Sequence, residues 1–305
     1  MHHTLKKIVI AGGSGFIGKL LADHLSRKWE VVVLSRTPKP TRGNIRTIGW
    51  NGRDPGDWIN EIEGAYSLIN LTGKNVNCRY TPQNKKEILD SRLLSTKVLG
   101  EAVKTLKSPP AVWIQMSSAT IYRHAIDKPM DETFGEIGSD FSMNVCCDWE
   151  RTFNELPLNG IRRVIMRTSI VMGKDGGALP PLRRLVRFGL GGCQGNGRQM
   201  VSWIHQQDIV GVVDWMLNGD ASGVYNVTSP QPIENKKLMR HLRKAYGVFF
   251  GLPSPKWLLT FGATLIGTET ELVLKSRWVI PKRLLQEGYR FRFPSVEGAI
   301  KDLVR

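Results

Sequence analysis

The stretch Lys7–Gly18, KIVIAGGSGFIG, decides the fold of this chain. Its first five residues are mostly β-branched and apolar, which predicts a strand covered on both faces. From residue 16 to residue 25, apolar residues recur at helical spacing, which predicts an amphipathic helix. Gly12, Gly15 and Gly18 are spaced so as to permit a tight turn, admit a pyrophosphate and let the helix pack close to the strand. The free amides at the start of that helix would bind the anion.

The length and composition are those of a soluble globular protein. A chain of 305 residues with 41% hydrophobic residues can bury a sizeable core. No apolar run reaches membrane-spanning length and no signal peptide fits before the first strand, so we expect a cytoplasmic protein without a transmembrane segment. The cysteines lack metal-ligand spacing, which predicts a reducing compartment and no bound metal. They are Cys78, Cys146, Cys147 and Cys193.

The formal net charge of +16 indicates an acidic partner. A phosphorylated cofactor, a nucleic acid and an anionic membrane surface would each fit, and so would basic side chains that only cover the solvated faces of helices. No helix-turn-helix, zinc finger or aromatic stacking motif accompanies the charge, so no specific nucleic-acid partner is predicted. We expect a small-molecule substrate, and the oligomeric state is left open, with a homodimer among the alternatives.

The second predicted strand, Glu30–Ser35, ends directly before Arg36. Sites for NAD usually carry an acidic residue near this point, which binds the ribose 2′-hydroxyl, whereas an arginine accommodates the 2′-phosphate of NADP. Ser35 and Arg36 therefore favour NADP as the cofactor. An exposed arginine on a loop is the alternative interpretation of Arg36.

Strands and helices alternate through the first 173 residues, which predicts a Rossmann-type, doubly wound parallel α/β sheet. Further strands are expected at 45–50, 65–71, 112–116 and 163–172, and the longer helices at 82–107 and 140–156. Beyond residue 173 the chain is mostly helical, apart from a short strand at 224–227. We interpret residues 1–173 as an NADP-binding Rossmann domain and residues 174–305 as a smaller, mostly helical substrate lobe.

Small and hydroxyl residues follow two of these strands, in Asn70–Gly73 and Ser117–Tyr122. The carboxyl ends of parallel strands line the ligand crevice of an open sheet. Both stretches are therefore expected to lie beside the cofactor.

Together, these motifs resemble the extended short-chain dehydrogenase/reductases, and more narrowly their atypical, epimerase-like branch, also called nucleoside-diphosphate-sugar epimerase-like proteins. The resemblance covers nearly the whole chain. It implies an NADP-binding oxidoreductase or epimerase with a C-terminal module of unknown function at about residues 250–300. Trp203-Ile204-His205 belongs to the broader resemblance. The narrower one is carried by Ser91-Arg92 with Ser95-Thr96, Trp149-Glu150, Gly176-Gly177, the glycine loop 189–199 and the tail from Val279 to Phe291.

The resemblance implies a cofactor site built from the glycine turn, the strand ends, the long helix and the sixth strand. Its predicted residues are Gly12, Gly15, Phe16, Ile17, Gly18, Ser35, Arg36, Leu71, Thr72, Gly73, Glu87, Arg92, Ser117 and Ile170. For Glu87 and Arg92, a solvated helix face is the alternative interpretation.

Classical members of this family use a Ser or Thr, a Tyr that acts as acid and base, and a Lys four residues after the Tyr. Ser118 matches the hydroxyl position. Cys146 and Glu150 stand where the Tyr and Lys belong, and the chain contains no Tyr-x-x-x-Lys. Ser118, Cys146 and Tyr122 are the catalytic candidates. Their structural alternatives are a strand-end cap, a packed helix residue and a phenol buried beneath the crevice.

Two residues of the second half are candidates for substrate binding. Arg198 lies in a glycine-rich loop and would meet an anionic group, and His205 is one of only six histidines. A structural histidine beside Asp208 is the alternative for His205. Three functions stay open. The first is an NADP(H)-dependent oxidoreductase or epimerase acting on a small anionic substrate, and the second is a non-catalytic NADP(H) sensor that lacks the acid–base pair. The third is a basic adaptor that binds membranes or nucleic acid, whose binding would collapse between low and moderate salt.

Overall fold

Seven parallel strands form the central sheet of the computed structural model, which describes residues 5–257, 259 and 269–305. Their order across the sheet is β10-β6-β5-β4-β1-β2-β3, so the chain winds outward from β1 in both directions. The strands are β1 Lys7–Ala11, β2 Glu30–Ser35, β3 Ile45–Gly49, β4 Ser67–Asn70, β5 Val112–Ser118, β6 Arg162–Thr168 and β10 Gly223–Val227. The predicted Rossmann-type, doubly wound α/β sheet is confirmed.

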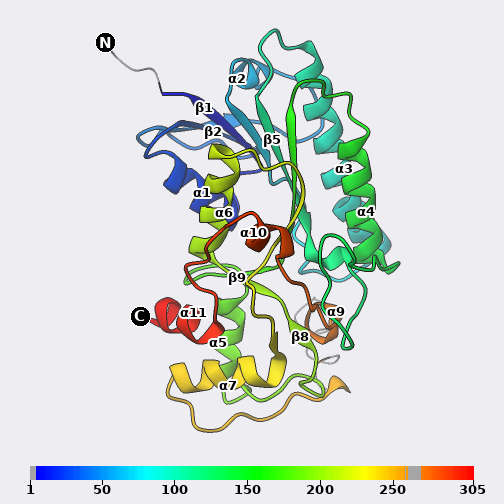
Figure 1. Cartoon of the computed structure of the whole chain (residues 1–305), viewed down its shortest axis with the longest axis vertical. Coiled ribbons are helices and arrows are strands. Elements are labelled where there is room, and N and C mark those ends of the chain that lie inside the picture. Colours follow the sequence, from blue (N-terminus) through cyan, green and yellow to red (C-terminus); the bar gives the residue numbers. More distant parts are fainter. Residues whose placement is uncertain (1–4, 258, 260–268) are drawn as a thin grey trace.

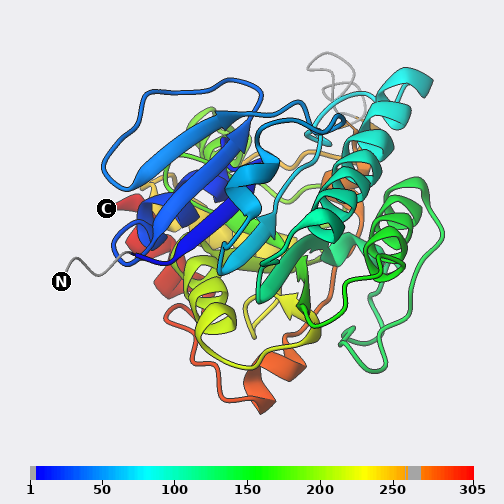
Figure 2. The same cartoon turned by 90° about the horizontal axis from the view of Figure 1, so that it is seen from above.

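Helices cover both faces of this sheet (Figures 1 and 2). α1 (Phe16–Leu25) and α6 (Gln206–Asn218) pack on one face. The other face is covered by α3 (Pro82–Thr105) and α4 (Phe141–Asn154), with the short α2 (Ile59–Ile62).

β1 shows how the sequence produces two covered faces. Ile8 and Ile10 enter the core beneath α1 and α6, whereas Val9 and Ala11 enter the core beneath α3 and α4. Successive side chains of a strand point to opposite faces, so a strand buried on both sides must be apolar throughout.

Two expectations about the strands were wrong. The predicted strand 163–172 is divided: after β6 the backbone N–H of Ser169 donates to the carbonyl of Val227, and β7 (Ile170–Met172) leaves the sheet to pair with β9 (Trp203–His205). The strand expected in the lobe at 224–227 is β10, which pairs with β6 in the central sheet. An apolar run predicts a buried strand but not which strand it pairs with, and this explains both errors.

Most of the remaining elements form the lobe below the sheet in Figure 1, whereas η1 (Ala119–Ile121) packs against α4 and β6, and α10 (Lys282–Gln286) packs against β10. The interior of the lobe is made by Trp203, Leu238, Leu242 and Ile300, with their neighbours. Within the described ranges, no helix is long and apolar enough to cross a membrane. The elements are η1 Ala119–Ile121 at the end of β5, α5 Leu179–Arg187, β8 Met200–Val201, β11 Ile233–Glu234, α7 Asn235–Ala245, α9 Glu271–Leu274, α10 Lys282–Gln286 and α11 Val296–Val304.

Candidate functional site

The glycine turn after β1 is closely packed at two glycines and open at the third. Gly12 has a φ of +72°, and a Cβ there would lie 2.9 Å from Thr72. A Cβ on Gly18 would lie 2.3 Å from the carbonyl oxygen of Gly13, so only glycine lets the helix pack this closely. A Cβ on Gly15 would meet nothing within 4 Å. The turn therefore presents a free surface at Gly15, where a ligand has room to approach.

Several polar groups around this turn have no partner in the described part of the chain. No side chain caps the N-terminus of α1. Oγ1 of Thr72 is buried without a hydrogen-bond partner. Arg36 is exposed just beyond β2, whose last residue, Ser35, accepts a hydrogen bond of 3.2 Å from the backbone N–H of Thr37. Unpaired amides, a hydroxyl and a guanidinium at these points fit the phosphates and ribose of a dinucleotide.

Phe16 is held by a glycine loop that the sequence did not connect with it. A Cβ on Gly173 or Gly176 would lie 2.2 Å from the ring of Phe16, and the ring also borders Gly177. These glycines follow β7, so the loop after β7 closes over the first turn of α1. Ile17 packs against the core on the same face. The sequence shows the glycine pair Gly176-Gly177, but nothing in it indicates that the pair packs against Phe16.

A buried polar network fixes the loop after β4. The Asn70 side chain donates hydrogen bonds to Gln115 (3.1 Å) and Thr96 (3.3 Å) and accepts one from the backbone N–H of Thr72 (3.0 Å). Trp149 of α4 also donates to Thr96, at 3.1 Å. The network joins β4, β5, α3 and α4 beneath Leu71, Thr72 and Gly73, so these backbone groups are held rigidly.

The residues at the family's catalytic positions do not form an acid–base pair. Burial raises the pKa of Cys146 to about 12, despite the opposing charge of Arg92. The thiol is therefore neutral at physiological pH. Ser118 is half-buried at the end of β5, where its Oγ donates to Oγ1 of Thr120 (3.0 Å) and accepts from the backbone N–H of Thr120 (3.2 Å). Ser118 thus caps η1, which matches the strand-end cap given as its structural alternative.

Glu150, at the lysine position, forms a buried ion pair with Arg167, which the sequence analysis did not single out. Arg167 donates to both carboxylate oxygens, at 2.9 and 2.7 Å, and Ser117 donates to Oε1 at 2.6 Å. Burial alone would lower the pKa of Arg167, but the hydrogen bonds and charge of Glu150 raise it above its usual range. The Tyr122 hydroxyl accepts from Arg167 and donates to Asn226, both at 2.9 Å. The Tyr122 phenol is buried, its hydroxyl both donates and accepts a hydrogen bond, and burial raises its pKa.

Two arginines whose charges act on the Cys146 thiol have no carboxylate partner among the described residues. The Arg92 guanidinium lies 5.1 Å from the ring centroid of Trp149 and donates to the carbonyls of Ile88 (2.8 Å) and Lys74 (3.2 Å). Nη1 of Arg277 is buried and has no hydrogen-bond partner. Burial lowers the pKa of both arginines, and the charges of both act on the Cys146 thiol. Arg277 follows α9, far along the chain, and no sequence motif connected it with this site.

The other predicted residues have varied surroundings. Glu87 pairs with Lys74, which links α3 to the loop after β4. Ile170 is 40% exposed at the start of β7. Arg198 is exposed, and its backbone N–H donates to Asn196 within its own loop. The structure does not bring Arg198 into contact with Ser118 or Cys146.

His205 has the surroundings of a structural histidine. It is fully buried, and its Nδ1 accepts from the backbone N–H of Gln207, which caps α6. The centroid of its ring lies 3.8 Å from the ring centroid of Phe293. Its Nε2 lies 3.3 Å from a carboxylate oxygen of Asp302, without hydrogen-bond geometry. Burial lowers its pKa to about 4. The predicted neighbour, Asp208, instead accepts hydrogen bonds from the backbone of residues 292 and 293.

An open glycine turn, an exposed arginine after β2 and polar side chains at the strand ends are the arrangement expected of a dinucleotide-binding protein. The model of the NAD dependent epimerase/dehydratase family matches residues 8–228, and a domain of unknown function (DUF1731) matches residues 254–303. This chain belongs to the NAD dependent epimerase/dehydratase family, and the resemblance to its atypical, epimerase-like branch is confirmed.

Relatives of this family match over their whole length. The mouse epimerase family protein SDR39U1 is 32% identical over 306 residues, covering 98% of this chain and 99% of the relative. Epimerase family protein YfhF of Bacillus subtilis is 30% identical, with 97% of each chain covered. The crystal structure of human SDR39U1 (isoform 2) with NADPH superposes with a TM-score of 0.86 at 28% identity, covering 98% of this chain and 99% of that one.

Proposed function

We propose that this protein binds NADPH across the glycine turn and transfers hydride between the cofactor and a carbonyl or hydroxyl carbon of a small anionic substrate. The observation that carries the proposal is the free surface at Gly15, beside an uncapped α1 N-terminus. Arg36, exposed beyond β2, is the partner of the 2′-phosphate. The human relative that was crystallised with NADPH supports the same choice.

The remaining cofactor contacts are proposed from the resemblance and the local surroundings. The apolar side chain of Ile170, 40% exposed, is suited to pack against the nicotinamide. We propose the cytoplasm as the compartment, and the four cysteines, all free thiols, support it. The other proposed contacts are Phe16, Ile17, Ser35, Leu71, Thr72, Gly73, Glu87 and Ser117.

Bound NADPH supplies the hydride, and the chain has to stabilise negative charge on the substrate oxygen. Arg92 and Arg277 suit this role, because neither pairs with a carboxylate among the described residues. Nη1 of Arg277 is also buried without a hydrogen-bond partner, which is costly until an anion binds it. Ser118, at the carboxyl end of β5, is the hydroxyl donor. The Cys146 thiol is buried with a raised pKa and is not assigned the role of proton donor. The proton that completes the alcohol comes from water.

A non-catalytic NADPH sensor is the second candidate. It is favoured by the Glu150–Arg167–Tyr122 network, which commits the residue at the family's Lys position and the nearby phenol of Tyr122 to structural contacts. A sensor needs the cofactor surface but no acid or base.

Fluorescence titration with NADPH and NADH tests the cofactor proposal. We expect micromolar NADPH binding, at least about tenfold tighter than NADH, because the 2′-phosphate gains a charge-assisted contact. Arg36→Glu should abolish this preference, whereas Lys39→Glu, an equal charge change at an exposed position in the same loop, should keep it. Failure of the wild type to bind either dinucleotide would overturn the proposal.

NADPH oxidation with matched carbonyl compounds, with and without a carboxylate, tests the chemistry. We expect turnover only with the carboxylates, and a loss of at least about tenfold in kcat/KM for Arg277→Gln. Arg151→Gln, at an exposed position on α4, is the control. Arg198→Gln is the rival variant, since a larger loss there would move the anion to the glycine-rich loop. Cofactor binding without oxidation of any compound would favour the sensor.

A further inference from the structure

The surface of α5 and α7 is basic, and its acidic neighbour is Glu234, which precedes α7 and pairs with Lys236 and Lys237. Residues 176–205 and 235–256 contain no Asp or Glu. On α7, Leu238, Met239 and Leu242 face the core, so the charged side chains project outward. The Lys and Arg residues of the two stretches are Arg183, Arg184, Arg187, Arg198, Lys236, Lys237, Arg240, Arg243, Lys244 and Lys256.

Large apolar side chains stand exposed on the same part of the lobe. Phe188 is 81% exposed, Phe249 is 100% exposed and Phe250 is 67% exposed, and Leu252 is exposed with them. Two loops, 188–192 and 249–252, carry these side chains. They form one surface, because the backbone N–H of Leu252 donates to the carbonyl of Gly189 (2.8 Å) and the N–H of Gly192 donates to the carbonyl of Leu252 (3.1 Å).

This apolar tip adjoins the basic helices directly. Nη1 of Arg243 donates to the carbonyl of Gly191, and the Arg187 guanidinium lies 5.7 Å from the ring centroid of Tyr246. We call the two loops together with α5 and α7 the basic–aromatic surface. Figure 1 shows α7 and the segment after it along the outer edge of the lobe, away from the central sheet.

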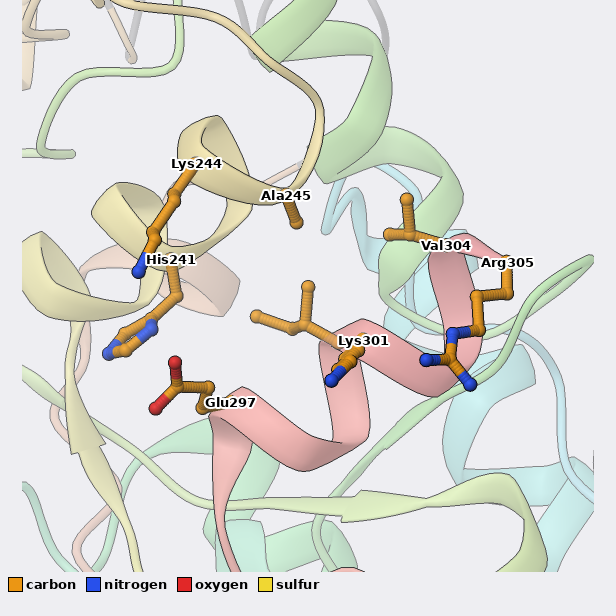
Figure 3. Close-up of a pocket in the computed structure, with 8 residues that line it drawn as sticks. His241, Lys244, Ala245, Glu297, Lys301, Val304 and Arg305 are labelled. Atoms are coloured by element: carbon orange, nitrogen blue, oxygen red, sulfur yellow. The ribbon is translucent and has the colours of Figure 1, made fainter.

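A cavity beside α7 extends the positive charge. It has a volume of about 350 Å³ and lies between α7 and α11, lined by Lys244, Lys301 and Arg305 among others. In Figure 3, His241 and Lys244 of α7 and Glu297 of α11 point into the space between the two helices. Among the described residues that line the cavity, Glu297 is the acidic one. The cavity is thus suited to a phosphate-bearing headgroup.

We propose that the basic–aromatic surface docks this protein on an anionic phospholipid bilayer. Exposed phenylalanines cost free energy in water but are stabilised when they enter the interfacial region of a bilayer, while lysines and arginines around them are attracted to anionic headgroups. A nucleic acid is less favoured, because Phe249 and Leu252 stand on an outward loop tip and not along a groove that follows a phosphate backbone. The protein docks peripherally, with the glycine turn after β1 left free.

Co-sedimentation with vesicles tests this proposal. The wild type should bind vesicles of equal parts phosphatidylcholine and phosphatidylglycerol and should not bind vesicles of phosphatidylcholine alone. Its binding to the anionic vesicles should weaken as the salt concentration is raised. Arg240→Gln with Lys244→Gln should lower the partition coefficient roughly tenfold or more, given about 1 kcal/mol for each basic residue at an anionic surface. Phe249→Ser with Phe250→Ser should also weaken binding, including the part that survives high salt.

Matched controls change the same chemistry elsewhere. Lys86→Gln with Lys97→Gln removes two exposed charges from α3, and Phe134→Ser removes a 74% exposed ring from another loop. Both should bind like the wild type, and unchanged NADPH affinity and Tm would show that all variants are folded. The proposal would be overturned by wild-type protein that ignores anionic vesicles, by test and control variants that bind equally, or by the same residues serving single-stranded RNA in preference to vesicles.

Discussion

At the residue scale, the most consequential side chain is Glu150, which occupies the lysine position of the classical family. Its carboxylate is buried against Arg167 and accepts a hydrogen bond from Ser117. Removing one partner of a buried ion pair leaves the other charge uncompensated. Breaking this pair by removing one partner is therefore expected to cost more than breaking an exposed pair.

Glu150→Gln is expected to lower the free energy of unfolding by about 3 kcal/mol, because Arg167 would stay buried without a counter-ion. Urea denaturation measures the effect. Asp148→Asn on the same helix is the control: Asp148 pairs with Arg151, whose side chain is 66% exposed, and its loss should cost less than about 1 kcal/mol. Equal losses of unfolding free energy in the two variants would show that breaking the buried Glu150 pair costs no more than breaking an exposed one.

The candidate site was predictable where its residues are neighbours in sequence. Gly12, Gly15 and Gly18 belong to one local motif, and the structure gives the tight and open positions that the motif requires. Arg167 and Arg277 were missed because their partners lie on other elements, and no spacing rule connects residues so far apart in the chain. Cys146 and Tyr122 were named from the motif, but only the structure shows the burial that makes both unsuitable as acids.

At the element scale, helices were predicted from local signals, whereas the pairing of strands depends on residues far apart in the chain. The long helix expected at 82–107 is α3, Pro82–Thr105, because apolar periodicity and an N-terminal Thr-Pro pair are local signals. β7 and β10 were misassigned because pairing is a long-range property: β7 joins β9, and β10 joins β6. A short apolar run indicates a strand without indicating its sheet.

The contact of α1 with the glycine loop after β7 gives an element-scale prediction. Gly176→Ala would place a Cβ 2.2 Å from the Phe16 ring and should cost about 2 kcal/mol of stability through overpacking. Phe16→Ala should remove most of that cost in the double variant, since the ring is the clashing group. Gly15→Ala, which meets nothing within 4 Å, should change the stability of the cofactor-free protein little. Thermal or urea unfolding of the wild type, Gly176→Ala, Phe16→Ala and their double variant completes the cycle. Strictly additive losses of stability in the two single variants would contradict the proposed contact.

At the scale of the whole molecule, His205 joins elements from three parts of the chain. It ends β9, caps α6 and contacts Phe293, and its Nε2 lies beside Asp302 of α11. Because burial lowers its pKa to about 4, the folded protein holds the ring neutral while the unfolded chain, with a pKa near 6.5, takes up a proton first. The contribution of His205 to stability is therefore fully present above pH 6.5 and is lost as the pH falls from 6.5 toward 4.

His205→Asn is expected to remove this pH dependence while keeping the cap, since an Asn oxygen can accept the Gln207 N–H that His205 now accepts. Between pH 7 and pH 5, the wild type should lose about 2 kcal/mol more than the variant. Taking the difference between the two proteins cancels the other titrating groups, including Glu132 and Asp208, whose pKa values burial raises. Urea unfolding at each pH measures it. Parallel stability curves would mean that the ring titrates alike in the folded and unfolded states, and that His205 joins α6 and α11 by packing alone.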